Sequence, residues 1–154
     1  MTTFTYVSAS DELWIGDNKG FIHCLDGQSL APKGDQQEIK THYGHPCHSM
    51  TSSAELVAVG DSKGYTTIYD AASKENKQYF SIHNNKVLQL HFSADGSHIL
   101  SLGFDKIIGL GTIEGSAVRK LQSPNDNAQT NSCCFFGEHI YSGGYDCSVR
   151  KWKY

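Results

Sequence analysis

Residues 141–152, with the sequence YSGGYDCSVRKW, have the character of a strand, a tight turn and a second strand. The adjacent Gly143 and Gly144 allow the chain to turn without a clash of a β-carbon. Asp146 stands where a carboxylate can accept hydrogen bonds from the amides of a turn. From Val149 onward the residues alternate in character with the period of two that is typical of a strand. This stretch therefore predicts a β-hairpin.

The same hairpin recurs earlier in the chain. The position of Asp146 is held by Lys19, Lys63 and Asp105, and the successive copies are 44, 42 and 41 residues apart. The first two turns, GDNKG and GDSKG, are almost the same. A period near forty residues with four short strands per unit is typical of β-propeller blades. The sequence therefore predicts an all-β fold of about four units, at approximately 1–41, 42–82, 83–122 and 123–154.

The expected strands follow from short apolar or alternating runs between turn residues. They lie at 4–7, 12–16, 21–25, 47–50, 56–60, 65–69, 78–82, 87–92, 99–102, 107–113, 118–121, 133–136, 139–142 and 149–152, with a looser strand inside 30–39.

The order Ser-Gly-Gly-x-Asp-x-x-Val-x-x-Trp, which begins at Ser142, closely resembles the second strand, turn and third strand of a WD40 blade. The dipeptide Gly44-His45 is similar to the Gly-His that precedes the first strand of a blade in this family. The resemblance implies WD repeats arranged as a β-propeller.

The fourth unit reaches its third strand at Trp152 and offers no fourth strand, and the first unit offers no spare strand ahead of Phe4. A propeller closes by making its first and last blades neighbours, which removes exposed sheet edges. We therefore expect an incomplete propeller that needs a partner or the rest of a longer chain to close. A homodimer that completes the ring is one such arrangement.

Composition narrows the classes of function. The chain of 154 residues has a formal net charge of −3, so no electrostatic attraction to nucleic acid or to an anionic membrane surface is predicted. No apolar run approaches the roughly 18 residues that span a bilayer. An odd number of cysteines, five, without framework spacing favours free thiols in a reducing compartment. The predicted location is the cytoplasm.

A closer resemblance is to the actin-interacting protein 1 family, and it covers nearly all of the chain. Asp146, Ser148, Val149 and Trp152 carry it, with Tyr154 as the last residue. It implies a factor that binds cofilin-decorated actin and promotes filament disassembly, hence an association with the cytoskeleton. The function predicted is a noncatalytic protein-interaction platform. The alternatives are a WD40 scaffold subunit of an unrelated complex and a propeller enzyme or metal-binding protein.

The WD40 resemblance also implies a buried hydrogen-bonded network of His, Ser or Thr, Asp and Trp in each blade. No unit has the full set, since Gly111 replaces Trp in the third unit and Lys63 replaces Asp in the second. A structural role is predicted for the members that are present, which are His45, His83, Ser101, Asp105, Ser142, Asp146 and Trp152.

The metal hypothesis is based on the cluster His45-Pro46-Cys47-His48, with Cys133 and Cys134 as further candidates. Zinc sites usually pair their ligands in two separate knuckles, a spacing that these residues lack. Asp17 and Asp61 belong to equivalent turns of different units, which favours turn residues over an acid and a base. No catalytic residue, cofactor or metal ligand is therefore predicted.

Aromatic residues at or near turns are candidates for a binding surface, because aromatic side chains are enriched at interface hot spots. The candidates are Tyr43, Tyr65, Phe104 and Tyr145. Trp14, in contrast, is expected to pack between blades.

Overall fold

The computed structural model describes residues 3–33, 38–115, 117–122 and 129–154, and every helix-or-strand element in these ranges is a β-strand. Fifteen strands form four antiparallel sheets, each made of strands consecutive in the chain. The described residues include no helix with the length and apolar character that a membrane crossing needs.

Sheets A and B each have four strands. Sheet A contains β1 (Thr3–Val7), β2 (Glu12–Gly16), β3 (Phe21–Asp26) and β4 (Glu38–Lys40). Sheet B contains β5 (Cys47–Ser52), β6 (Leu56–Asp61), β7 (Tyr65–Asp70) and β8 (Asn76–Ser81).

Sheet C has four strands and sheet D has three. Sheet C contains β9 (Val87–Phe92), β10 (His98–Gly103), β11 (Ile107–Thr112) and β12 (Val118–Gln122). Sheet D contains β13 (Thr130–Phe136), β14 (His139–Gly144) and β15 (Val149–Lys153).

The all-β prediction is confirmed, and each predicted strand corresponds to an observed one within a few residues at either end. The looser strand expected inside 30–39 overlaps the short β4 at residues 38 and 39, and residues 34–37 of that range lie outside the described residues. A single bridge pairs Leu25 with Pro32. Proline has no amide hydrogen to donate, so it does not extend this ladder. The four sheets lie within the four predicted repeat units, whose boundaries stay a prediction.

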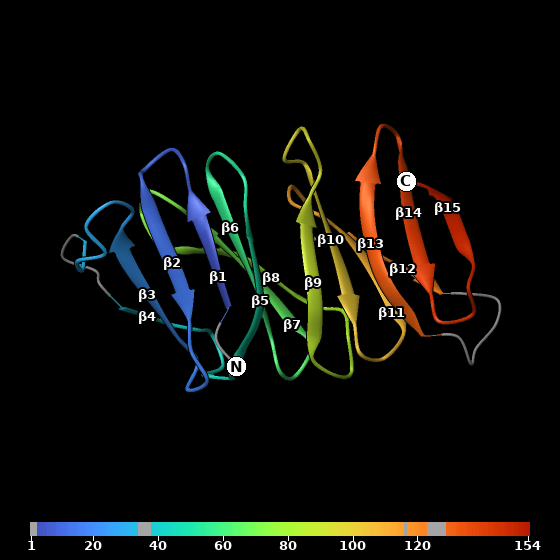
Figure 1. Ribbon diagram of the computed structural model, residues 1–154, viewed down its shortest axis with the longest axis horizontal. Helices are drawn as coiled ribbons and strands as arrows, with labels where there is room; N and C mark the ends of the chain where they lie inside the picture. The colour runs from blue at the N-terminus through green and yellow to red at the C-terminus, as the bar shows by residue number, and fades with distance from the viewer. Residues whose placement is uncertain (1–2, 34–37, 116, 123–128) are drawn as a thin grey trace.

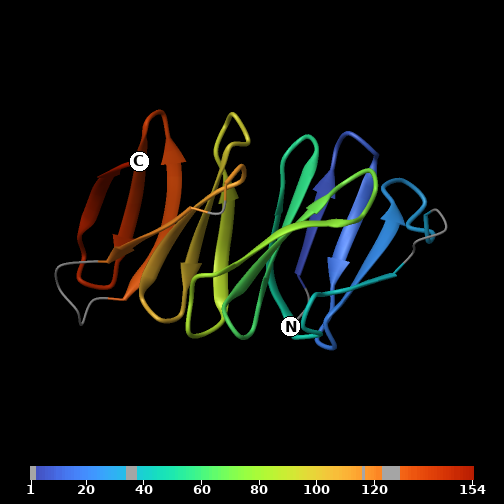
Figure 2. The ribbon, with the colours of Figure 1, turned by 180° about the vertical axis from the view of Figure 1, so that it is seen from behind.

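The sheets stand in a row in chain order, with sheet A at one end and sheet D at the other (Figure 1). The first strands of the sheets lie next to one another, since β5 contacts both β1 and β9, and β9 contacts β13. The view from behind shows β8 and β12 on the opposite side of the row (Figure 2). The described chain is therefore an open series of propeller blades, not a closed ring.

Three apolar clusters fill the spaces between consecutive sheets. Trp14 of sheet A packs with Val57 and Tyr69 of sheet B, and similar clusters join B to C and C to D. The burial of the second strands shows the consequence. All six residues of β6 are buried, whereas β2 and β14 alternate between buried and partly exposed residues. The inner sheets are thus covered on both faces and the end sheets on one.

Close backbone approach explains the glycine at the end of β2 and the glycine one residue before the end of β6. A β-carbon on Gly16 would lie 2.5 Å from Cys47 Cβ, and one on Gly60 would lie 2.6 Å from Val87 Cβ. Both contacts reach across to the next sheet. These glycines therefore set how tightly neighbouring sheets pack.

A buried ion pair joins sheets A and B. Glu12 Oε1 lies 3.3 Å from Nζ of Lys74, in the loop between β7 and β8, and both side chains are less than one-tenth exposed. Trp14 Nε1 donates a 3.0 Å hydrogen bond to Glu12 Oε2, and Ser10 Oγ donates one of 3.1 Å. The carboxylate is therefore neutralised and hydrogen-bonded in the same place where Trp14 is buried.

We expect Lys74→Met to lower the free energy of unfolding by about 3–5 kcal/mol, because it leaves the Glu12 charge buried without its partner. Lys77→Met is the matched control, since Lys77 is 52% exposed and pairs with Asp70 at 3.2 Å. Its expected effect is below about 1 kcal/mol. Urea denaturation of both variants measures the difference, and equal effects would contradict the role of the buried pair.

Candidate protein-interaction site

Sheet C brings together the three predicted network residues of the third unit. His83 Nδ1 lies 3.0 Å from Asp105 Oδ1, and its Nε2 lies 2.8 Å from Ser101 Oγ. His83 and Ser101 are both buried, and the amide of Asn84 donates to Asp105 Oδ2 at 2.9 Å. Burial lowers the pKa of His83, although Asp105 opposes this shift. The imidazole is therefore held in its neutral form at neutral pH.

The tryptophan that this network lacks would have no room in sheet C. A β-carbon on Gly111 would lie 3.0 Å from Ile99 Cγ2 and 3.1 Å from the ring of Phe80. Phe80 comes from β8 of the neighbouring sheet and is buried. The phenylalanine thus lies where a side chain at position 111 would project.

Sheet D divides its predicted network residues into two groups. Trp152 Nε1 donates a 2.9 Å hydrogen bond to Ser142 Oγ. Asp146 instead accepts hydrogen bonds from Ser148 and pairs with Arg150. Arg150 and Ser148 hold the pKa of Asp146 well below its usual range.

In sheet B the partner of His45 is Asp61, a residue that the sequence analysis assigned only to a turn. His45 Nδ1 lies 2.9 Å from Asp61 Oδ2, while Asp61 Oδ1 accepts hydrogen bonds from the amides of Lys63 and Tyr65. Asp17 caps the equivalent turn of sheet A in the same way. The sequence signal for this pairing was the Gly-Asp dipeptide that the first two turns share. It places the aspartate two residues before the position that aligns with Asp146 in the repeat. The structural role assigned to all these network residues stays a prediction.

Five rings form a cluster on sheet B and the segment that leads into it, which we call the aromatic patch. Its members are His42, Tyr43, His45, Tyr65 and Tyr79.

Tyr43 is the centre of the aromatic patch. Its ring centroid lies 4.4 Å from those of His42 and Tyr65, 5.7 Å from that of His45 and 6.2 Å from that of Tyr79. Tyr43 is 44% exposed and Tyr79 49% exposed, so the rings contact one another and still face solvent. Burial, together with the neighbouring Tyr79 and Tyr65, raises the pKa of Tyr43. Its hydroxyl therefore stays protonated and can donate a hydrogen bond at neutral pH.

The segment between β4 and β5 positions the patch by a tight turn. Gly44 has a φ of +65°, and its amide donates to the carbonyl of Thr41 at 3.0 Å. Thr41 Oγ1 in turn donates to the carbonyl of Gly20 at 2.9 Å. This anchors the segment on the β2–β3 turn of sheet A, while Tyr65 and Tyr79 come from β7 and β8.

The other two predicted interface residues lie apart from the patch. Phe104 and Tyr145 occupy the corresponding turns of sheets C and D and are 46% and 70% exposed. Lys86 Nζ lies 4.9 Å from the centroid of the Phe104 ring. Within the described part of the chain, no ring contact connects either residue to the aromatic patch.

The candidate metal ligands do not converge. Cys47 is buried between sheets A and B, where burial raises the pKa of its thiol to about 12, and His45 faces Asp61. Burial likewise raises the pKa of Cys133 to about 12, while Cys134 is exposed. Among the described residues, no group of three or more His, Cys, Asp or Glu side chains is arranged to hold a metal.

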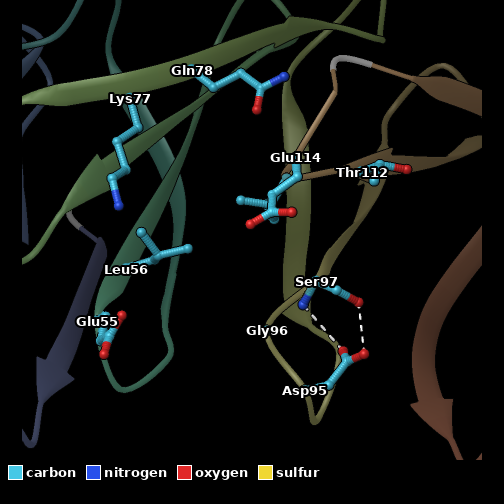
Figure 3. Close-up of a pocket in the computed structure, with 10 residues that line it drawn as sticks. Glu55, Leu56, Lys77, Gln78, Asp95, Gly96, Ser97, Thr112 and Glu114 are labelled. Atoms are coloured by element: carbon cyan, nitrogen blue, oxygen red, sulfur yellow. Dashed lines mark hydrogen bonds between the residues drawn. The ribbon is translucent and has the colours of Figure 1, made fainter.

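A groove of about 680 Å³ lies where turns of sheets B and C meet (Figure 3). Glu55, Asp95 and Glu114 contribute carboxylates to it, and Lys77 contributes an ammonium group. Asp95 is held in place by hydrogen bonds from Ser97, 2.7 Å from its hydroxyl and 3.1 Å from its amide. Since the groove is assembled from turns of two different sheets, no local pattern in the sequence indicated it.

If His83 is a buried neutral member of a structural network, the stability of the protein should fall as the pH falls below about 6.5. The sign follows from its lowered pKa, because the unfolded chain then binds a proton that the folded chain resists. We expect His83→Gln to cost about 1–3 kcal/mol at pH 7, through unsatisfied groups on Ser101 and Asp105, and to reduce the dependence of stability on pH between 5 and 7. Denaturation midpoints across this range test both effects, and an unchanged slope in the variant would refute the assignment.

Comparison with known proteins places these features in a family. The family described as WD domain, G-beta repeat matches residues 74–110 and 112–153. WD repeat-containing protein 1 of Rattus norvegicus is 24% identical over 148 residues, which cover 92% of this chain and 24% of that protein. The Bos taurus protein of the same name is 25% identical over 137 residues, which cover 85% of this chain and 22% of that protein. The chain thus spans about a quarter of the length of these curated relatives.

Solved structures agree on the fold. The computationally designed Ika4 protein superposes with a TM-score of 0.80 at 15% identity, covering 98% of this chain and 89% of that one. The designed Ika8 protein gives 0.77 at 18% identity, covering 99% of this chain and 45% of that one. The β-propeller domain of Cps50 (Swd1) from Myceliophteria thermophila gives 0.63 at 14% identity, covering 98% and 69%. Because the two matched ranges make up more than half of its residues, this chain belongs to the WD domain, G-beta repeat family.

Proposed function

We propose that this protein is a noncatalytic platform that binds a protein partner through the aromatic patch, and that the partner is the cofilin-decorated actin filament. The observation that carries the proposal is the patch itself, in which Tyr43 and Tyr79 are about half exposed although each contacts other rings. Large rings that are exposed together on a protein surface commonly mark an interaction site.

The patch has the properties of an interface hot spot. Tyrosine provides a large contact area and a hydroxyl group, and it has few rotatable bonds to order on binding. The rings already pack against one another, and the bond from His45 to the buried Asp61 fixes one edge of the patch. A partner would therefore meet a surface that is largely pre-organised, which lowers the entropic cost of binding.

The alternative that the protein is an enzyme would be based on Ser101, His83 and Asp105, which are the residue types of a hydrolase triad. Ser101 is 0% exposed, and its hydroxyl also lies within 3.4 Å of the carbonyl of Gly109. A nucleophile must reach a substrate carbonyl, and this hydroxyl is enclosed between strands. The burial of Ser101 supports a noncatalytic role.

The choice of partner is supported by sequence relationships. The chain is similar to WD repeat-containing protein 1, and its final strand resembles that of the actin-interacting protein 1 family. The chain spans about a quarter of the length of those relatives, and promotion of filament disassembly is part of the same proposal. A cytoplasmic location with the actin cytoskeleton belongs to the same proposal.

Cosedimentation with actin filaments, with and without cofilin, tests the proposal. We expect binding to cofilin-decorated filaments. We expect Tyr43→Ala combined with Tyr65→Ala to weaken it at least about tenfold, since a hot-spot truncation costs about 2 kcal/mol or more and about 1.4 kcal/mol corresponds to tenfold in affinity. Tyr145→Ala is the matched control, because Tyr145 is 70% exposed and outside the patch.

The outcomes separate the two parts of the proposal. No binding by the folded wild-type protein would reject actin as the partner and favour a scaffold of another complex. Binding that the double variant leaves unchanged would reject the aromatic patch as the contact surface.

A further inference from the structure

The two end sheets of the row each have one face that no other described part of the chain covers. On sheet A this open face carries Phe4 and Tyr6, which are 68% and 50% exposed, and the register places them opposite Ile15 and Leu13. On sheet D the open face includes Phe136, which is 75% exposed. Exposed apolar groups on two sheet faces indicate surfaces built to be covered.

The repeat alignment shows what normally covers such positions. Val149 of sheet D is 79% exposed, whereas the aligned Ile22, Thr66 and Ile108 are at most 1% exposed because the next sheet packs on them. Tyr141 is partly exposed, whereas the aligned Trp14, Ala58 and Leu100 are fully buried. Sheet D therefore presents the surface on which a following sheet would pack.

Sheet A presents the opposite half of the same interface. Its Leu13 and Leu25 are partly exposed, and they align with Val57 and Tyr69 of sheet B, which are 0% and 2% exposed against sheet A. We propose that the open face of sheet D packs on the open face of sheet A of a second copy of this chain, and the reverse, so that two copies close one ring.

The chain length agrees with two copies in one propeller. The superposition on the Ika8 protein uses 99% of this chain but 45% of that one. Two such rows would therefore supply about the length of that one chain. A two-fold axis lets each copy use both of its open faces and leaves none exposed.

The contact between sheets A and B serves as a template for the closing contact. In the template a β-carbon on Gly16 would lie 3.2 Å from Met50 Sδ, and Thr5 Oγ1 lies 3.0 Å from Ser52 Oγ. The strand registers make Gly143 of sheet D the equivalent of Gly16, and Phe4 the equivalent of Met50. Phe4 of the second copy would thus lie beside Gly143.

The second template contact brings Tyr6 to Cys134. Cys134 is paired with Tyr141 in sheet D as Thr5 is paired with Trp14 in sheet A, so Cys134 is the equivalent of Thr5. In the same way Tyr6 of sheet A is the equivalent of Ser52 of sheet B. Tyr6 of the second copy would therefore lie against Cys134.

Sheet D has a hollow at each of these two places. One hollow, of about 280 Å³, is lined by Gly143, Val149 and Cys134 among others, and would receive Phe4. The other, of about 430 Å³, is lined by Cys134, Phe136, Tyr141 and Phe135, and would receive Tyr6. The two exposed aromatic side chains of one face thus correspond to two apolar hollows of the other.

The charged groups near the open faces also affect which faces can pair. Lys151, whose Nζ lies 6.0 Å from the centroid of the Tyr141 ring, and Lys153 give β15 a basic edge. On sheet A, Tyr6 donates a 2.8 Å hydrogen bond to Asp11, and Glu38 is 61% exposed at its side chain. A pairing of sheet D with sheet D would bring the basic edges of two copies toward each other, which disfavours the pairing of like faces.

The solution mass of the 154-residue chain, measured by sedimentation velocity, tests the association. We expect twice the chain mass of 17.0 kDa. Phe4→Asp and Phe136→Asp should each give monomers, because both residues are exposed in the single chain and their replacement spares its fold. Phe104→Asp, in the turn between β10 and β11, is the control that should keep the dimer. Circular dichroism checks that all three variants stay folded.

A cross-link tests the arrangement. Tyr6→Cys should form a disulfide with Cys134 of the second copy, because the hydroxyl oxygens at the two template positions lie 3.0 Å apart. The background carries Cys147→Ser, which removes the other exposed thiol. We expect a covalent dimer on oxidation that is absent when Cys134→Ser is added.

Each outcome decides the proposal. A compact monomer would overturn it and would indicate that another segment of a longer protein covers these faces. A dimer that does not form the 6–134 cross-link would overturn the pairing of sheet A with sheet D, and open polymers would overturn the closed ring.

Discussion

An antiparallel sheet with apolar residues on both faces is stable in water only if both faces are covered, and the rest of this structure follows from that requirement. The repeat unit produces such sheets, so each one must have neighbours on two sides. The clusters around Trp14, Ile99 and Ile140 satisfy the requirement within the row. Strand β6 is fully buried because both faces of its sheet are covered. Strands β2 and β14 alternate between buried and partly exposed residues because only one face of their sheets is covered.

Much of the fold could be predicted from the sequence because the determinants are local and repeated. Turn residues at a constant period mark the hairpins, and the number of strands follows from them. The pairing of His83 with Ser101 and Asp105 was accessible for the same reason, since each residue has a fixed place in the unit. The partner of His45 could not be predicted in this way. In sheets A and B the aspartate stands two residues before the position of Asp105 in the repeat, and its side chain also caps the turn.

The candidate site was only partly accessible, because it depends on contacts between distant strands. Tyr43 and Tyr65 could be selected as aromatics near turns, but nothing in the sequence placed Tyr79 beside His42, with ring centroids 5.0 Å apart. The groove between sheets B and C is a similar case. Its carboxylates belong to turns whose proximity depends on how two sheets pack, and packing geometry is not encoded in any one segment.

Each sheet is made of strands consecutive in the chain, and this has a consequence for how the protein forms during synthesis. A sheet can assemble as soon as its own segment of some forty residues has left the ribosome, without waiting for distant partners. The next sheet then condenses on a surface that already exists. Within the described chain the row grows in one direction by templated addition, so sheets B, C and D each find a preformed surface as they are translated.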